Sequence, residues 1–384
     1  MKKTIVKILS YILVAAIASS TTVICFLTAQ RKNSTKLQEV QSVIDGYFIG
    51  DVDQSKLEDA AASAMIKALG DRWSYYMTAE EYKSYQQTMS NSYVGIGITV
   101  QSREDGTGFE IINVTNEGPA KAAGILAGDV IVAVDGTDVA GMDSSSLSAL
   151  VRGEENTSVT LTILRDNQHK QFSVTRQKFQ TAVATYQMLE GNIGLVTIEN
   201  FDARCAQETI AAIDALTSQG AKALIFDVRN NPGGYKDEMV KVLDYLLPEG
   251  PLFRAVDYRG KETVDHSDEK HLDIPMAVLV NLSSYSAAEF FAAALNEYDA
   301  AITVGEKTYG KGYFQTAFVL SDGSAVNLSI GKYTTPNGVS LAGVGLTPEV
   351  EIPVDEATAA KIAAGILSPE EDPQIIAAIN ALKS

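Results

Sequence analysis

Residues 276–295 read MAVLVNLSSYSAAEFFAAAL. The first five residues are all apolar, which is typical of a short strand that is buried on both faces of a sheet. A short turn follows, and Ser286 then begins an alanine-rich run that contains Glu289 three positions later. A serine followed at this spacing by a glutamate is the pattern of a helix capping box. The stretch therefore predicts a buried strand that leads through a tight turn into a helix.

The same alternation of strand and helix extends to both sides of this stretch. Ile193–Glu199 and Ala223–Val228 are short apolar runs, and helical patterns cover Ala206–Leu216 and Asp237–Leu247. Buried strands that alternate with helices indicate layers of helix packed on a sheet. We expect an α/β core over residues 177–354.

The flanking regions have different patterns, so the chain is expected to be a multidomain α+β and α/β protein. Residues 31–90 are predicted to be largely helical, with one helix ending near Gly70 and Thr78 opening another. Residues 91–176 read as a β domain of short strands that begins with Tyr93–Val100. Residues 355–384 form an alanine-rich helical tail.

The N-terminal segment has the pattern of a membrane anchor. Lysines in the first seven residues precede the uncharged apolar run Ile8–Ala29, which is long enough to span a bilayer. Leu27-Thr28-Ala29 is a poor cleavage site, so we expect residues 1–30 to remain as an anchor, the alternative being a cleaved signal peptide. Basic residues follow the segment as well, so charge alone leaves its orientation open.

Composition excludes several classes of function. The chain carries 31 basic and 48 acidic residues, a formal charge of −17, which disfavours binding of nucleic acid. The two cysteines, Cys25 and Cys205, are too few for a disulfide framework, and Cys205 is interpreted as a packing residue. The three histidines have no metal-site spacing, so neither a metal nor another cofactor is predicted.

Two glycine-containing segments of the β domain carry a more specific signal. They are YVGIGI at residues 93–98 and GILAGDVIVAVDG at residues 124–136, and together they resemble a PDZ domain. The resemblance implies that backbone N–H groups near Gly95, Ile96, Gly97 and Ile98 bind the C-terminal carboxylate of a peptide that adds to the sheet as a strand. The alternative is a glycine-rich strand entry of another small β domain.

Residue chemistry points to a serine and a lysine. A nucleophile at Ser286 would gain from the positive end of the helix dipole and from free N–H groups, although most serines at such positions only cap the helix. Lys311 lies between Gly310 and Gly312, which allow close approach of another chain. Lysine has an ordinary pKa of about 10.4, so a lysine base near neutral pH needs a pKa lowered by about 3 units.

A third segment, DVRNNPGG at residues 227–234, ends a strand in a Pro-Gly-Gly turn whose amides either face a ligand or serve only as a connection. In this order the three segments resemble the C-terminal processing peptidases, Ser/Lys proteases that carry a PDZ domain. The resemblance implies that Ser286 is the nucleophile, Lys311 the general base and Gln315 the residue that orients the lysine. It further implies an oxyanion hole formed by the N–H groups of Ala287 and of Gly233 or Gly234.

The resemblance also implies a cellular setting and a substrate. Members of the family are usually exported, so we expect a single-pass protein of the cell membrane with its catalytic part outside the cytoplasm. The substrates would be proteins with free C-termini, cut near that end, and a homo-oligomer is left open. The alternative function is a PDZ adaptor with an inactive or tightly gated peptidase core. Ser284 is a second candidate nucleophile with a less suitable spacing to Lys311.

Overall fold

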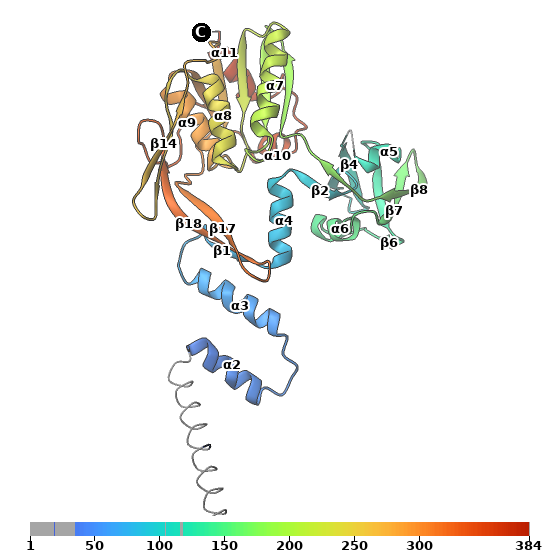
Figure 1. Ribbon diagram of the computed structural model, residues 1–384. Coiled ribbons are helices and arrows are strands. Elements are labelled where there is room, and N and C mark those ends of the chain that lie inside the picture. Colours follow the sequence, from blue (N-terminus) through green and yellow to red (C-terminus); the bar gives the residue numbers. More distant parts are fainter. Residues whose placement is uncertain (1–18, 20–34, 104, 116–117, 384) are drawn as a thin grey trace, which may run out of the picture. The chain divides into compact units, whose positions relative to one another are not determined.

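The computed structural model describes Ser19 and residues 35–103, 105–115 and 118–383, which form two units that divide after Met65 (Figure 1). The predicted anchor, residues 1–30, lies outside the described residues apart from Ser19. In the part of the chain that is described, no helix is both long and apolar enough to cross a membrane.

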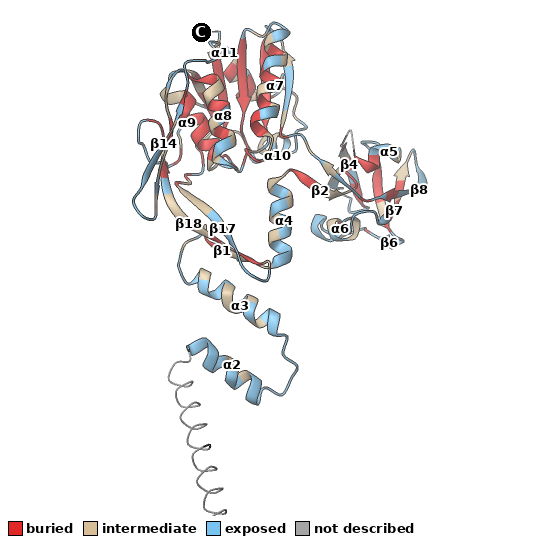
Figure 2. Cartoon of the chain, in the orientation of Figure 1, coloured by how far each residue is buried: buried red, intermediate tan, exposed pale blue. Residues whose placement is uncertain are grey.

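The first unit contains α2 (Lys36–Tyr47) and most of α3 (Gln54–Lys67). Thr35 caps α2 in a capping box with Gln38. Neither helix has a buried residue, and Figure 2 shows both in pale blue and tan along their length. The predicted helical character of this region is confirmed.

The β domain folds around its own core. One sheet has the order β3-β4-β5-β7-β8 with β6 beside β5, and the short helices α5 and α6 accompany it. The apolar side chains of these strands form a separate buried cluster. The elements are β3 (Ile98–Ser102), β4 (Phe109–Val114), α5 (Pro119–Ala122), β5 (Val130–Val134), β6 (Thr137–Asp138), α6 (Ser144–Val151), β7 (Ser158–Arg165) and β8 (Gln168–Thr175).

The predicted strand Tyr93–Val100 is wrong in one respect, because the structure divides it. β2 (Ser92–Gly95) pairs with β9 (Gln177–Gln180) in a two-stranded ribbon outside the domain sheet, and β3 begins only at Ile98. Gly97 has φ 76°, a left-handed conformation that interrupts an extended strand. The start and the end of the β domain therefore lie side by side in the ribbon.

The α/β core is a six-stranded sheet with the order β10-β11-β12-β15-β16-β19, parallel except for the edge pair β10–β11. Successive side chains of each strand point to opposite faces, so Leu224 and Phe226 join the core beneath the α7, α8 and α9 side, while Ala223 and Ile225 pack with α11. The predicted layers of helix on sheet are confirmed. The elements are β10 (Ala184–Leu189), β11 (Ile193–Ile198), α7 (Cys205–Ser218), β12 (Ala223–Asp227), α8 (Lys236–Leu246), β15 (Met276–Val280), α9 (Ala287–Glu297), β16 (Ala301–Gly305), β19 (Val350–Glu351), α10 (Glu356–Ala363) and α11 (Pro373–Ala381).

A second sheet, which the sequence patterns did not predict, joins distant parts of the chain. Its order is β1-β18-β13-β14, with β17 also paired to β18. β1 lies inside the region predicted to be helical, and its Tyr75 pairs with Asn327 of β18. This pairing places the residues just before β1 beside the core. The elements are β1 (Tyr75–Met77), α4 (Ala79–Met89), β13 (Gly250–Asp257), β14 (Glu262–Ser267), β17 (Tyr313–Val319) and β18 (Ala325–Thr334).

Candidate active site

One cavity of about 740 Å³ brings together all six residues for which the sequence predicted a part in peptide hydrolysis. They come from three connections that follow strands of the core sheet, and from β17 of the second sheet. Carboxyl ends of parallel strands are the usual position of a site in such a sheet. The six are Gly233, Gly234, Ser286, Ala287, Lys311 and Gln315.

Ser286 occupies a strained turn between β15 and α9. Its φ of 59° and ψ of −125° are unusual for a residue with a side chain, and such a conformation costs about 1–3 kcal/mol. The Ser286 N–H donates to the Glu289 carboxylate at 3.1 Å, and the Tyr333 hydroxyl donates to Ser286 Oγ at 3.3 Å. The hydroxyl therefore faces the cavity on a turn that the surrounding contacts hold in place.

Glu289, predicted only as a capping residue, connects the two segments that carry the serine and the lysine. It is fully buried, and it accepts hydrogen bonds from the Thr308 hydroxyl at 2.6 Å and from the Gly310 and Lys311 N–H groups at 2.6 and 2.9 Å. Burial raises the pKa of Glu289, and these hydrogen bonds act in the opposite direction. Glu289 thus fixes the backbone of Lys311 relative to Ser286.

Lys311 lies in a partly buried environment that suits a neutral amine. Burial lowers its pKa to about 8, although the charges of Glu289 and Asp71 act to raise it. Its Nζ lies 4.6 Å from the centre of the Trp73 ring. No acidic residue adjoins Lys311 in sequence, so these two carboxylates are neighbours that only the fold supplies.

Ser286, Lys311 and Gln315 line one cavity, but their side chains are not hydrogen-bonded to one another in the part of the chain that is described. Among the residues that the structure describes, no hydrogen bond links Lys311 Nζ to Ser286 Oγ or to Gln315. The Gln315 amide instead donates to the Tyr313 carbonyl at 3.0 Å and to Ser329 Oγ at 3.1 Å. The role of Gln315 in orienting the lysine stays a prediction.

The Pro-Gly-Gly turn packs directly against the serine. A Cβ atom on Gly233, whose φ is 88°, would lie 2.7 Å from Ser286 Cβ and 2.9 Å from the Ala287 nitrogen, so only glycine fits there. The Gly233 N–H donates to Asn231 Oδ1 at 2.8 Å and is therefore occupied. Across the described residues the N–H groups of Gly234 and Ala287 have no such partner, and the oxyanion hole expected from them stays a prediction.

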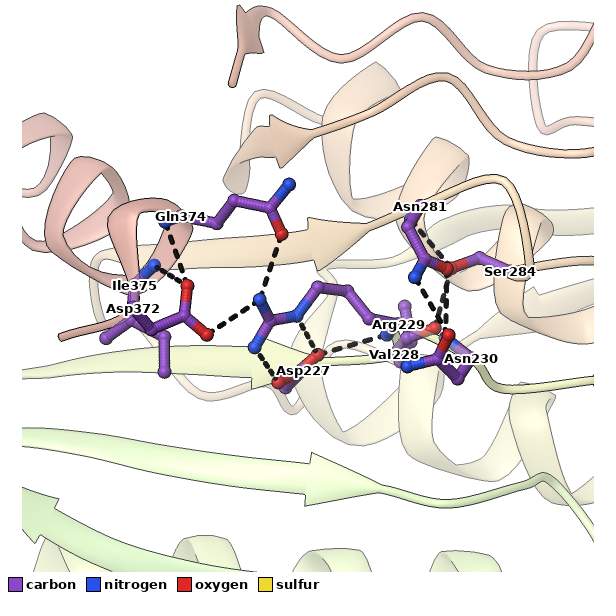
Figure 3. A network of polar contacts seen from close by, with 9 residues as sticks. All are labelled: Asp227, Val228, Arg229, Asn230, Asn281, Ser284, Asp372, Gln374 and Ile375. Carbon is purple, nitrogen blue, oxygen red and sulfur yellow. Dashed lines mark hydrogen bonds and ion pairs between the residues drawn. The ribbon is translucent and has the colours of Figure 1, made fainter. Parts of the chain in front are cut away.

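A network of polar contacts, partly buried and partly exposed, connects the two turns (Figure 3). Ser284 Oγ donates to the Val228 carbonyl at 2.7 Å, and the Asn281 amide donates to Asn230 Oδ1 at 3.0 Å. These contacts connect the turn after β15 to the turn after β12. Ser284 is fully buried and bound in this way, which argues against it as the nucleophile.

Figure 3 also shows that α11 reaches this network through Arg229. The guanidinium forms ion pairs with Asp227 at 2.6 Å and with Asp372 at 2.8 Å, and it donates to Gln374 Oε1 at 2.9 Å. Since all the partners are buried, removal of the guanidinium would leave two buried carboxylates without a counter-charge. The tail predicted as a separate helical region thus contributes to the support of the candidate site.

A second cavity, of about 330 Å³, lies at the segment predicted to bind peptide C-termini. Gly95, Ile96, Gly97 and Ile98 all line it, as does Arg152, which sequence reasoning had not singled out. The Ile96 side chain is only 2% exposed and belongs to the core of the β domain. Its side chain therefore packs inside the domain, and the predicted binding of a carboxylate by backbone N–H groups of this segment stays a prediction.

The described residues include no group of three or more His, Cys, Asp or Glu side chains that could hold a metal ion. Cys205 is buried at the start of α7, where burial raises its thiol pKa to about 12.

Comparison with known proteins defines the class as serine peptidases with a PDZ domain. Residues 192–352 match the model of peptidase family S41, residues 94–175 match the PDZ domain, and residues 17–81 match the N-terminal domain of the activating protease CtpB. The chain belongs to peptidase family S41, as predicted from its sequence.

Curated relatives and a solved structure agree with this assignment. The chain is 34% identical over 330 residues to a "Probable CtpA-like serine protease" of Staphylococcus epidermidis, and 34% identical over 324 residues to one of Staphylococcus aureus. The matches cover 84% and 83% of this chain but 66% and 65% of the relatives, just under two thirds of their length. The structure of a photosystem II D1 C-terminal processing protease is similar with a TM-score of 0.50 and 28% identity, covering 84% of this chain and 88% of that one.

Proposed function

We propose that the chain is a serine endopeptidase that cuts proteins near their C-termini, with Ser286 as nucleophile and Lys311 as general base. The observation that carries the proposal is the shared cavity, in which a strained serine and a lysine with a pKa lowered to about 8 lie together. Membrane attachment through residues 1–30, with the catalytic part outside the cytoplasm, belongs to the same proposal.

The proposed reaction proceeds through an acyl-enzyme. Neutral Lys311 Nζ takes the Ser286 hydroxyl proton while Oγ bonds to the carbonyl carbon of the substrate, and the carbonyl electron pair moves to oxygen. The N–H groups of Ala287 and Gly234 stabilise this oxyanion. The lysine ammonium then gives its proton to the leaving amine as the C–N bond breaks. Water then attacks the ester carbonyl carbon while Lys311 takes a proton from it, and the ammonium returns this proton to Ser286 Oγ as the C–Oγ bond breaks.

One observation favours the alternative of a tightly gated core. Ser286 Oγ is bound to Tyr333, and Lys311 Nζ lies over Trp73. Catalysis then requires the lysine side chain to leave the indole ring and approach Ser286 Oγ. A protein that remained in the arrangement described above would bind C-termini without cutting them.

A fluorophosphonate label distinguishes the two functions. We expect a single modified peptide that contains Ser286, because only an activated serine displaces the fluoride at an appreciable rate. Ser283→Ala, which removes an exposed hydroxyl from the same turn, should leave labelling unchanged, whereas Ser286→Ala should abolish it. Absence of labelling in the full chain with and without substrate peptide would support the adaptor.

We further propose that the PDZ domain binds the substrate's free C-terminus at the 330 Å³ cavity, where Arg152 supplies a positive charge beside the backbone of Gly95–Ile98. Amidation of that terminus removes a charge-assisted interaction of about 1.5–3 kcal/mol, so the expected loss in kcat/KM is about tenfold to a hundredfold. Cleavage of one peptide as free acid and as amide, followed by chromatography, is the measurement.

The control for this comparison is a Glu→Gln exchange far from the terminus of the same peptide. It changes the net charge by the same amount but keeps the C-terminal carboxylate. Its rate should match that of the free acid. Equal cleavage of acid and amide would show that the PDZ domain does not bind C-termini.

A further inference from the structure

A carboxylate with no assigned role lies in the wall of the catalytic cavity. Asp202 lines this cavity and is only 4% exposed. It follows Phe201, whose backbone is joined to Gly233 and Tyr235 by hydrogen bonds of 2.7 Å. A Cβ atom on Gly234 would lie 2.6 Å from Asp202 Oδ1. The carboxylate is therefore adjacent to the turn that packs against Ser286.

Within the described ranges, the Asp202 carboxylate has no hydrogen bond and no ion pair. The nearby cations are engaged elsewhere, since Arg204 pairs with Glu208 at 2.6 Å and Lys236 pairs with Asp265 at 2.8 Å. Burial raises the pKa of Asp202 to about 7. A buried carboxylate without a partner is unfavourable, and a bound cation would remove that penalty.

Helix capping does not account for Asp202, although it lies just before α7. The Ala206 N–H at the start of α7 is satisfied by the Glu238 carboxylate at 2.9 Å, and only the backbone carbonyl of Asp202 accepts a bond from the helix, from the Cys205 N–H. The side chain is thus available to a ligand in the cavity, where Tyr85 and Tyr235 provide neighbouring aromatic surface.

We propose that Asp202 is a specificity residue that binds a lysine or arginine side chain of the peptide substrate next to the scissile bond. This inference rests on the proposed peptidase function and names part of its substrate class. The formal charge of −17 on the chain also attracts cationic peptides. A carboxylate in a partly desolvated wall discriminates strongly between a cationic side chain and an apolar one of similar length.

The test is a peptide series in which lysine replaces norleucine at each position on both sides of the cleaved bond. At one position we expect lysine to raise kcat/KM by about tenfold or more in the full chain. Asp202→Asn should reduce this ratio to about one, and because the ratio compares two peptides on the same variant, any effect common to both peptides cancels. Asp237→Asn, which removes the same charge from an exposed residue outside the cavity, should retain the ratio.

The same peptides are also bound to Ser286→Ala, with and without Asp202→Asn, and their Kd values are compared. If the chain binds the lysine peptide more tightly than the norleucine peptide and Asp202→Asn removes this preference, the subsite is supported. This holds even if the wild-type chain cuts no peptide. Absence of cleavage would count against the peptidase function but not against the subsite. Equal Kd and kcat/KM for lysine and norleucine at every position, or a preference that persists in Asp202→Asn, would overturn the proposal.

Discussion

Ser286→Ala is expected to lower kcat/KM for peptide cleavage by about 10⁴-fold or more, because the hydroxyl oxygen forms the covalent bond of the acyl-enzyme and no other group replaces it. The fold should persist. The Ser286 N–H keeps its hydrogen bond to the Glu289 carboxylate, and the variant loses the contacts of the hydroxyl, among them the hydrogen bond from Tyr333. Cleavage of a fluorogenic peptide and the melting temperature are measured on the same preparation.

The matched control for this prediction is Ser283→Ala. Ser283 belongs to the same turn and is exposed, so its hydroxyl can be removed without disturbing the buried contacts of Ser284. We expect wild-type rates for this variant. Turnover by Ser286→Ala within about tenfold of wild type would exclude Ser286 as nucleophile.

Lys311→Arg is expected to reduce kcat/KM by about 10³-fold or more, even though the positive charge is kept. A general base must be neutral before it accepts a proton, and arginine cannot be deprotonated at any working pH. The larger guanidinium must also fit beside Trp73 and the buried Glu289. Initial rates on a saturating and a dilute substrate separate the effects on kcat and KM.

The pH profile of the wild-type chain tests the same residue independently. The Lys311 pKa is about 8, so the neutral fraction of the lysine falls about tenfold for each pH unit below 8. Above pH 9 deprotonation of the lysine is nearly complete. The rate should rise with this fraction and then reach a plateau. Lys307→Arg, at an exposed position nearby, should keep both the rate and the profile. A rate independent of pH between 6 and 9 would contradict the lysine base.

Sequence reasoning identified the candidate site residues that lie in recognisable short sequence patterns. Ser286 at a strand-to-helix turn, Lys311 between glycines and the Pro-Gly-Gly turn are recognisable in short windows, and they line one cavity. Glu289 was seen, but only as a cap. Its contact with the segment of Lys311 depends on two connections that meet at the edge of the sheet, which no local pattern encodes.

The structural features that sequence reasoning did not predict depend on pairings between residues that are distant in the chain. Trp73 lies over Lys311 because β1 pairs with β18 far along the chain, and β1 is too short to leave an alternating pattern in a region dominated by helices. The backbone of Ile96 was assigned to peptide binding through the resemblance of residues 93–98 to a PDZ domain, and the position of its side chain was not foreseen because the strand was expected to continue from β2 to β3. The left-handed conformation of Gly97 breaks that strand and directs Ile96 into the core.

The network around Arg229 has a consequence for the order in which the protein matures. Asp372 and Gln374 provide two of the partners of the buried guanidinium, and both lie far downstream of Ser286 and Lys311 in the chain. During synthesis, all the residues of the candidate site are made before these two. Until residue 374 has emerged, Arg229 has only Asp227 to balance it, and the turns of Gly233 and Ser286 lack part of their support. A chain made in this order completes the buried support of its candidate site only after its last helix has been synthesised.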